Sequence, residues 1–337
     1  MKIGVIGAGS WGTALAALLA EEAKNQVILW AFEPEVVTGI NQNRRNPLYM
    51  SQAEMPKALK VTDKLRTACE GASLLVNAVP SNHTRKVWRQ AASFVKPEGI
   101  VVNAAKGLEE ESGRRLSQVL AEALSRLDPG RIVTLSGPSF AQEVLAHQPT
   151  TVVIAGPDKK VAERVQKIFR REWFLVYTHE DQVGVEMGGA LKNVIAIATG
   201  ICDGMGLGYN TRAALITRGL YEMTKLGKAL GANPLTFAGL TGMGDLILTC
   251  TGELSRNRTV GLRLGKGEKL DAILKNMKNV AEGVKTAKVA FQLIRKHKIN
   301  NPVFTEVYRI LHEGKDPRQA LKDLLAIDLK EELGGLL

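Results

Sequence analysis

The stretch KIGVIGAGSWGTALAALLA, residues 2–20, decides the fold. Its first five residues are a nearly all-apolar run, typical of a strand buried on both faces of a parallel sheet. Its last eight residues predict a helix. The uncharged run after Lys2 resembles a signal peptide in length, but four glycines and a serine interrupt positions 3–12. We therefore interpret the stretch as strand, turn and helix, and not as a targeting segment.

The turn has the pattern G-x-G-x-x-G. Gly7 permits a tight turn, Gly9 lets the backbone approach a pyrophosphate, and Gly12 lets the helix lie close to the strand. The pyrophosphate would accept hydrogen bonds from free N–H groups at the positive end of the helix. The turn, with Ser10 and Trp11, is therefore predicted to bind a dinucleotide.

A second apolar run, residues 26–30, predicts the next strand, and Glu33 follows about twenty residues after the glycine turn. A carboxylate at this place binds the hydroxyls of the adenosine ribose and would repel a 2′-phosphate, which favours NAD over NADP. Two alternatives stay open. Glu33 could be a surface residue before Pro34, and Arg44 and Arg45 could serve a 2′-phosphate.

Three more apolar runs, residues 73–79, 99–105 and 131–135, each end in turn residues. In an open parallel sheet such turns meet at the carboxyl edge of the strands, where ligands bind. Ser10, Trp11, Pro80, Lys106 and Ser139 are therefore expected to face one crevice. With two further strands at 149–154 and 173–177, we predict a doubly wound, mostly parallel Rossmann sheet over residues 1–181.

Beyond residue 181 long helical periodicity replaces the strand pattern, which predicts an all-α domain over residues 182–337. Residues 210–219 are expected to form an internal helix of this domain. Its first helix places Lys192 among apolar and small residues, on one face with Gly188 and Gly189. The glycines could make room for a ligand beside the lysine. Alternatively, they could let a neighbouring helix pack closely while the lysine reaches water.

Residues 240–250 contain Asp245 and Thr249, four apart and on one face if helical, after glycines that suit a turn. Ser255 is expected to cap the following helix. Arg256 and Asn257 would then lie in its first turn, where a basic residue opposes the helix dipole unless an anion binds.

The composition excludes several other classes of protein. Three widely spaced cysteines favour neither a disulfide framework nor structural zinc, and they suit a reducing cytoplasm. The net charge of +11 is dispersed among helical positions without an aromatic RNA-binding signature. We therefore expect small phosphorylated ligands and no nucleic acid, no metal and no membrane insertion.

Seven motifs are similar to those of bacterial NAD(P)-dependent glycerol-3-phosphate dehydrogenase. They span nearly the whole chain: GAGSWGTALA (7–16), AKGLE (105–109), SGPSFAQEV (136–144), GGALKNVIAIATG (188–200), ALITRGL (214–220), GMGDLILTC (242–250) and SRNR (255–258). The resemblance implies a cytoplasmic homodimer that reduces dihydroxyacetone phosphate to sn-glycerol 3-phosphate for glycerophospholipid synthesis.

The resemblance also implies roles for individual residues. The residues expected to be catalytic are Lys192, Lys106 and Asp245. The residues expected to contact substrate are Lys106, Gly137, Ser139, Lys192, Asp245, Ser255, Arg256 and Asn257. The residues expected to contact the cofactor, NAD or NADP, are Gly7, Gly9, Ser10, Trp11, Gly12, Glu33, Lys106, Ala141, Arg256, Val280 and Glu282.

One position departs from the family pattern. Phe32 stands where the family commonly has a histidine or arginine beside the adenosine, and an apolar side chain cannot bind a 2′-phosphate. This strengthens the preference for NAD.

Two rival interpretations remain. One is a related two-domain dehydrogenase that acts on a 3-hydroxy acid or sugar acid. Such enzymes favour a lysine and asparagine two residues apart, whereas Lys192 and Asn193 are adjacent. The other is a dinucleotide sensor or nucleic-acid-binding regulator, which would not need Lys106, Lys192, Asp245 and Arg256 together.

Overall fold

A computed structural model describes residues 1–275, 277, 281–327, 331, 332 and 334. The chain forms two compact units. The sheet unit comprises Met1–Lys106 and Arg115–Gln182, and the helical unit comprises Gly107–Arg114 and Val183–Leu337. The short excursion Gly107–Arg114 into the helical unit is not indicated by the sequence, which places it inside the first domain.

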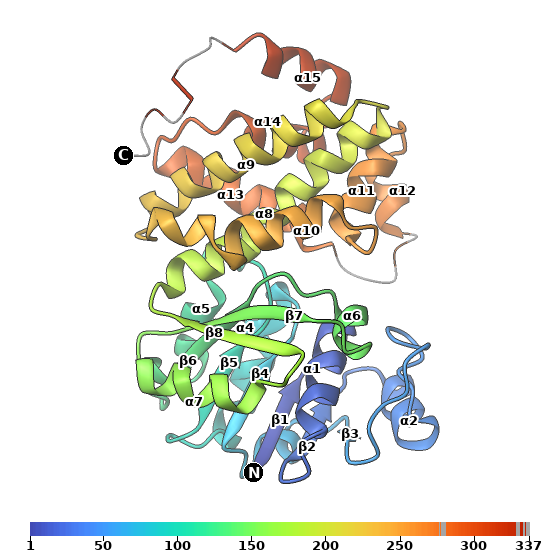
Figure 1. Ribbon diagram of the computed structural model, residues 1–337, viewed down its shortest axis with the longest axis vertical. Coiled ribbons are helices and arrows are strands. Elements are labelled where there is room, and N and C mark those ends of the chain that lie inside the picture. The colour runs from blue at the N-terminus through green and yellow to red at the C-terminus, as the bar shows by residue number, and fades with distance from the viewer. Residues whose placement is uncertain (276, 278–280, 328–330, 333, 335–337) are drawn as a thin grey trace. The chain divides into compact units, whose positions relative to one another are not determined.

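The sheet unit is built on eight strands in the order β3-β2-β1-β4-β5-β6-β7-β8 (Figure 1). They are β1 (Lys2–Ile6), β2 (Gln26–Trp30), β3 (Lys60–Thr62), β4 (Leu74–Asn77), β5 (Ile100–Asn103), β6 (Ile132–Ser136), β7 (Thr150–Ala155) and β8 (Phe174–His179). All neighbours are parallel except β6 and β7. The predicted doubly wound, mostly parallel sheet is therefore confirmed. The chain order reverses between β1 and β4, and in sheets of this kind ligands bind outside the carboxyl ends of the strands at such a point.

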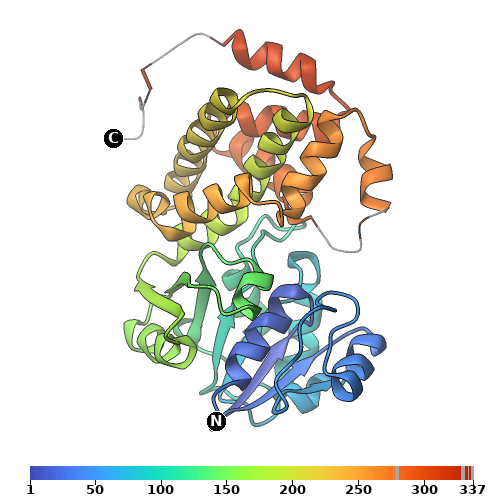
Figure 2. The same ribbon diagram turned by 45° about the vertical axis from the view of Figure 1, so that its right-hand side comes forward.

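Helices cover both faces of this sheet. Successive strand residues point to opposite sides, so each buried strand presents apolar side chains to the helices on either face. Ile3 and Val5 join the core beneath α1 (Ser10–Ala20), whereas Ile6 joins the core beneath α4 (Ser81–Ala91). In the turned view of Figure 2, α1 (dark blue) lies along its face of the strands. The remaining helices of this unit are α2 (Pro34–Asn43), α3 (Leu65–Cys69), α5 (Leu116–Ala123), α6 (Ala141–Leu145) and α7 (Lys159–Phe169).

The helical unit is organised around α8 (Gln182–Gly204), in which every residue from 184 to 202 is buried. The helix is long and apolar enough to cross a membrane, but its apolar window is entirely buried. It is therefore a core helix of this unit. The other helices of this unit are α9 (Tyr209–Ala229), α10 (Asp245–Thr251), α11 (Arg256–Gly265), α12 (Leu270–Lys275), α13 (Glu282–Lys296), α14 (Pro302–His312) and α15 (Pro317–Leu325).

Helices α8 and α11 meet backbone to backbone along a seam of four glycines. A Cβ on Gly200 would lie 2.1 Å from the carbonyl oxygen of Arg258, and one on Gly261 would lie 2.0 Å from that of Ile197. One turn further along, a Cβ on Gly204 or Gly265 would likewise lie too close to a carbonyl oxygen of the other helix. Since no other residue lacks a Cβ, the glycine seam (Gly200, Gly204, Gly261 and Gly265) fixes the separation of the two helices.

Two expectations about this unit are corrected. Gly188 does not leave room for a ligand, because a Cβ there would lie 2.6 Å from the carbonyl oxygen of Thr241. It serves the close packing that was the alternative interpretation. The run 210–219 was expected to be an internal helix, yet only Gly219 is buried within it. Its apolar residues are too widely interrupted by polar ones to be buried on all sides.

Candidate active site

The glycine turn of the sheet unit leaves one end of α1 open. Gly9 precedes the helix without any side-chain cap, and no heavy atom lies within 4 Å of where its Cβ would be. Gly7 has φ +107°, a backbone conformation that favours glycine. Gly12 has no such space, because a Cβ there would lie 1.9 Å from the carbonyl oxygen of Gly7. The first-turn N–H groups can therefore receive a pyrophosphate.

Side chains around the turn are anchored to neighbouring loops. Ser10 donates a hydrogen bond from Oγ to the carbonyl of Tyr49 at 3.3 Å. The indole of Trp11 donates to the carbonyl of Ala104, just beyond β5, at 3.0 Å. Both contacts hold the start of α1 at the carboxyl edge of the sheet.

Glu33 directly precedes α2, which begins at Pro34, and its carboxylate does not cap that helix. It accepts a hydrogen bond from the hydroxyl of Tyr49 at 2.8 Å. Nearby, Phe32 is 79% exposed. The two arginines considered for a 2′-phosphate are engaged elsewhere. Arg44 donates to the carbonyl of Met55 at 2.6 Å, and Arg45 donates to the carbonyls of residues 51 and 52.

Lys106 follows β5, and its ammonium donates to the carbonyl of Gly137 at 2.8 Å. Gly137 follows β6 with φ +135°, where a Cβ would lie 2.9 Å from Cα of Val152. The hydroxyl of Ser139 donates to the same carbonyl at 3.0 Å. The structure thus joins three predicted substrate contacts, and Ala141 begins α6 two residues later.

In the helical unit, Lys192 is 6% exposed and Asp245 is 1% exposed. The ammonium of Lys192 donates to Oδ1 of Asp245 at 2.5 Å and to Oγ1 of Thr249 at 2.6 Å. Asp245 begins α10 after a π-helical turn, Leu240–Gly244, so Thr249 lies on the same face one turn later. A carboxylate this close stabilises the protonated ammonium, the form that can donate a proton. Burial also raises the pKa of the neighbouring Cys250 thiol to about 12, which keeps it protonated.

An amide chain links three helices beside this cluster. The side-chain oxygen of Asn193 accepts from Nδ2 of Asn257 at 2.9 Å, and Oδ1 of Asn257 accepts from the backbone N–H of Gly283 at 2.9 Å. The chain connects α8, α11 and the start of α13. Asn257 is therefore occupied on both sides of its amide, so its contact with substrate would use the remaining N–H.

Ser255 caps α11, as the sequence predicts, and accepts from the backbone N–H of Arg258 at 3.2 Å. Arg256 is the first residue of this helix and is exposed. Arg258 points the other way, and its guanidinium binds Asp203 at 2.7 Å. Glu282 begins α13 and is half-buried, whereas Val280 lies outside the described residues.

The comparisons with known proteins agree along the whole chain. The family described as NAD-dependent glycerol-3-phosphate dehydrogenase matches residues 2–162 with its N-terminal part and residues 181–322 with its C-terminal part. The chain belongs to this family. A relative from Geobacter metallireducens, named glycerol-3-phosphate dehydrogenase [NAD(P)+], is 52% identical over 99% of both chains. The prediction of an NAD(P)-dependent dehydrogenase of this family is therefore confirmed.

Solved structures separate the family from its rivals. A glycerol-3-phosphate dehydrogenase from Coxiella burnetii matches with a TM-score of 0.92 and 38% identity, covering 97% of this chain and 99% of that one. A ketopantoate reductase from Ralstonia eutropha matches with a TM-score of 0.60 and 14% identity, over 95% and 100% of the chains. The second likeness is one of fold alone.

Two residues of this dehydrogenase were not in the predicted site. Thr249 was noted only for its spacing from Asp245, although a hydroxyl one turn after a buried carboxylate suits a second partner for a lysine. Asn193 was quoted beside Lys192 without a role. Its signal was a buried amide on an otherwise apolar helix, since buried amides need hydrogen-bond partners.

Proposed function

We propose that this chain catalyses the reduction of dihydroxyacetone phosphate to sn-glycerol 3-phosphate with NADH or NADPH, and the reverse reaction. The observation that carries the proposal is the buried cluster of Lys192, Asp245 and Thr249 in a member of this family. In this reaction the nicotinamide supplies the hydride when bound. The chain must then bind both molecules and move one proton.

Lys192 is the proposed proton donor. When the ketone carbon becomes an alcohol, its oxygen needs a proton, and a buried ammonium can supply one. Asp245 and Thr249 accept hydrogen bonds from the ammonium and fix it in place. In the reverse direction the same nitrogen takes the proton back.

Arg256 is the proposed holder of the substrate phosphate. A guanidinium at the start of α11 combines a charged, bidentate donor with the positive end of a helix. The resemblance adds Ser255 and Asn257 here, and Lys106, Gly137 and Ser139 in the sheet unit. We propose that residues 1–181 are the dinucleotide-binding domain and residues 182–337 the substrate and catalytic domain.

For the cofactor we propose a preference for NADH. Support comes from Glu33 after β2, from exposed Phe32, and from the engagement of Arg44 and Arg45 with loop carbonyls. Ala141, Val280 and Glu282 are further proposed contacts that rest on the resemblance.

Initial rates with dihydroxyacetone phosphate and each reduced cofactor test both proposals. We expect saturable oxidation of the cofactor and a higher kcat/KM for NADH. No turnover with dihydroxyacetone phosphate, together with turnover of a 3-hydroxy acid, would reject the substrate. Equal kcat/KM for NADH and NADPH would reject the cofactor preference and leave the substrate untouched.

The cellular setting rests on the resemblance. We propose a cytoplasmic homodimer whose product enters glycerophospholipid synthesis. Sedimentation equilibrium of the purified chain tests the assembly, and a monomer at micromolar concentration would reject it.

A further inference from the structure

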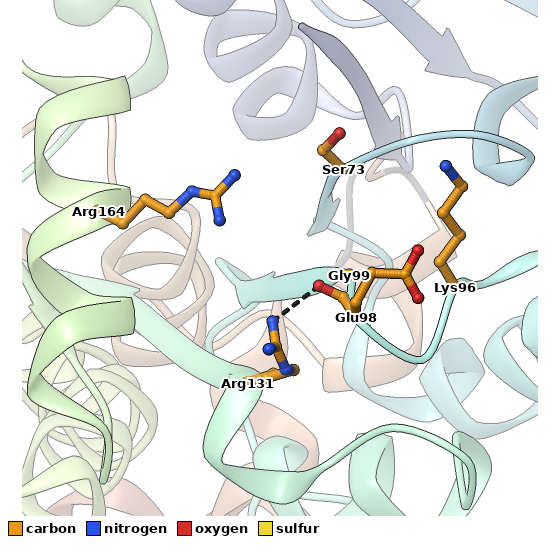
Figure 3. Close-up of a pocket in the computed structure, with 6 residues that line it drawn as sticks. All are labelled: Ser73, Lys96, Glu98, Gly99, Arg131 and Arg164. Atoms are coloured by element: carbon orange, nitrogen blue, oxygen red, sulfur yellow. Dashed lines mark hydrogen bonds between the residues drawn. The ribbon is translucent and has the colours of Figure 1, made fainter.

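A polar pocket lies on the sheet unit, away from the glycine turn. It is lined by Ser73, Lys96, Glu98, Gly99, Arg131 and Arg164 and has a volume of about 230 Å³ (Figure 3). Ser73, Gly99 and Arg131 directly precede β4, β5 and β6. The pocket is therefore at the amino edge of these parallel strands, whereas the dinucleotide turn is at their carboxyl edge.

Three cationic side chains from separate segments converge on this pocket, with one carboxylate. Figure 3 shows Arg164 reaching toward it from α7, with Lys96 on the opposite side. Among the residues that the structure describes, neither Lys96 nor Arg164 has a carboxylate within ion-pair distance. Elsewhere on this unit, Arg66 pairs with Glu70 and Arg85 with Glu122. Unpaired like charges around a concave surface repel one another and favour a bound anion.

The pocket is also partly preorganised. Arg131 donates from Nη1 to the backbone carbonyl of Glu98 at 2.7 Å, which fixes its guanidinium at the pocket wall. The turn that carries Lys96 and Glu98 is closed by a backbone hydrogen bond from Gly99 to Lys96 at 3.0 Å. Ser73 has its backbone N–H and carbonyl engaged by the sheet, and its hydroxyl remains available. Side chains held in place lose less entropy when a ligand binds.

Size and chemistry define the class of ligand. A volume of this size equals about eight water molecules and falls below the roughly 300 Å³ at which pockets for larger ligands begin. Arginine and lysine donors suit a tetrahedral phosphate, and the Glu98 carboxylate suits a ligand hydroxyl. We propose that this pocket binds a small hydroxylated phosphate monoester, as a site separate from the proposed active site.

Binding of two probes, inorganic phosphate and glycerol 2-phosphate, tests this at constant ionic strength by ³¹P line broadening. Saturating NAD⁺ covers the dinucleotide turn, and Arg256→Ala removes the proposed phosphate holder of the active site. In that background we expect saturable binding of both probes. Adding Arg164→Gln or Lys96→Gln should weaken it about tenfold or more, the usual effect of losing a charge-assisted hydrogen bond.

Lys167→Gln is the matched control, because Lys167 lies exposed on the same helix and does not line the pocket. Equal weakening by Arg164→Gln and Lys167→Gln would show attraction to general surface charge and overturn the site. Absence of saturable binding would overturn it as well. Glu98→Gln should weaken glycerol 2-phosphate more than phosphate, and an equal effect would overturn the hydroxyl contact. None of these results depends on turnover of dihydroxyacetone phosphate, because the inference goes beyond the proposed function.

Discussion

Helix α1 of the sheet unit and helix α11 of the helical unit both begin where an anion is expected, yet their first turns differ. Gly9 leaves the first turn of α1 uncapped, open and without charge. In α11, Ser255 caps one N–H and Arg256 adds a guanidinium. The first helix would bind a phosphate with backbone groups, and the second with a side chain.

The same contrast extends through both units. Among the described residues, the buried polar side chains of the sheet unit are all neutral, such as Asn77 and Asn103. The buried charged side chains all belong to the helical unit: Glu109, Glu186, Lys192, Glu222, Asp245 and Glu306. A parallel sheet satisfies its own backbone and tolerates no unpaired charge in its core. The helical unit instead buries ionisable groups, among them Lys192 and Asp245 of the candidate active site.

The largest expected effect comes from removing the buried ammonium. Lys192→Ala should lower kcat by about 10³-fold or more, because no other described group lies ready to donate the proton. It also removes the buried ion pair with Asp245, which should destabilise the helical unit by about 3–5 kcal/mol. NADH binding, measured by fluorescence, should persist because the glycine turn and Glu33, which we expect to bind the pyrophosphate and the ribose, lie in the sheet unit. Lys269→Ala, an exposed control, should change neither kcat nor stability. Substantial turnover by Lys192→Ala would reject Lys192 as the proton donor.

Two glycines of the dinucleotide turn should respond differently. Gly12→Ala forces a Cβ against the carbonyl of Gly7 and should lower the free energy of unfolding by about 3 kcal/mol. Gly9→Ala has space for its methyl group and should leave stability within about 0.5 kcal/mol, but should weaken NADH binding because the backbone can no longer approach the pyrophosphate. Thermal unfolding of both variants measures the effect on stability, and NADH titration measures the effect on cofactor affinity. Unaltered NADH binding by Gly9→Ala would contradict the backbone mode.

Glu222 tests how the helical unit carries a buried charge. Its carboxylate accepts from the backbone N–H groups of Val303 and Phe304 at the start of α14, and burial raises its pKa to about 7. The raised value means that the folded state holds the proton more tightly than the unfolded chain. Its contribution is therefore fully present below about pH 4.5 and is lost as the pH rises through about 7.

We expect the free energy of unfolding of the natural chain to fall by about 2–3 kcal/mol over that range relative to Glu222→Gln. Denaturant titrations at several pH values measure the difference. Parallel pH profiles for the two proteins would show that Glu222 does not titrate in this range.

The smallest expected effect concerns the exposed guanidinium. Arg256→Ala should raise KM for dihydroxyacetone phosphate roughly tenfold, the equivalent of one charge-assisted hydrogen bond near water. Arg256→Lys should recover only part of this, because an ammonium lacks the bidentate geometry. Arg263→Ala is the control on the same helix. Steady-state kinetics decide, and an unchanged KM would remove Arg256 as the phosphate holder.

The sheet unit was predictable because glycines, apolar runs and turn residues are local signals. The strand at 60–62 was missed because three residues carry too little pattern. In the helical unit, sequence periodicity predicted the helices but not which residues of different helices contact one another. That Gly188 packs on Thr241, or that Asn193 binds Asn257, depends on residues some fifty positions or more apart, which periodicity does not report. The roles of Lys192 and Arg256 came from the resemblance.

The glycine seam between α8 and α11 has a consequence for selectivity. Lys192 projects from one helix of that pair and Arg256 begins the other, so the glycine seam fixes how far apart the backbone positions of the two residues lie. This backbone separation sets the distance between the proposed proton donor and the proposed phosphate holder. A substrate with one more carbon between carbonyl and phosphate would not match both ends at once. Discrimination by substrate length would then not require side chains that close the end of a pocket.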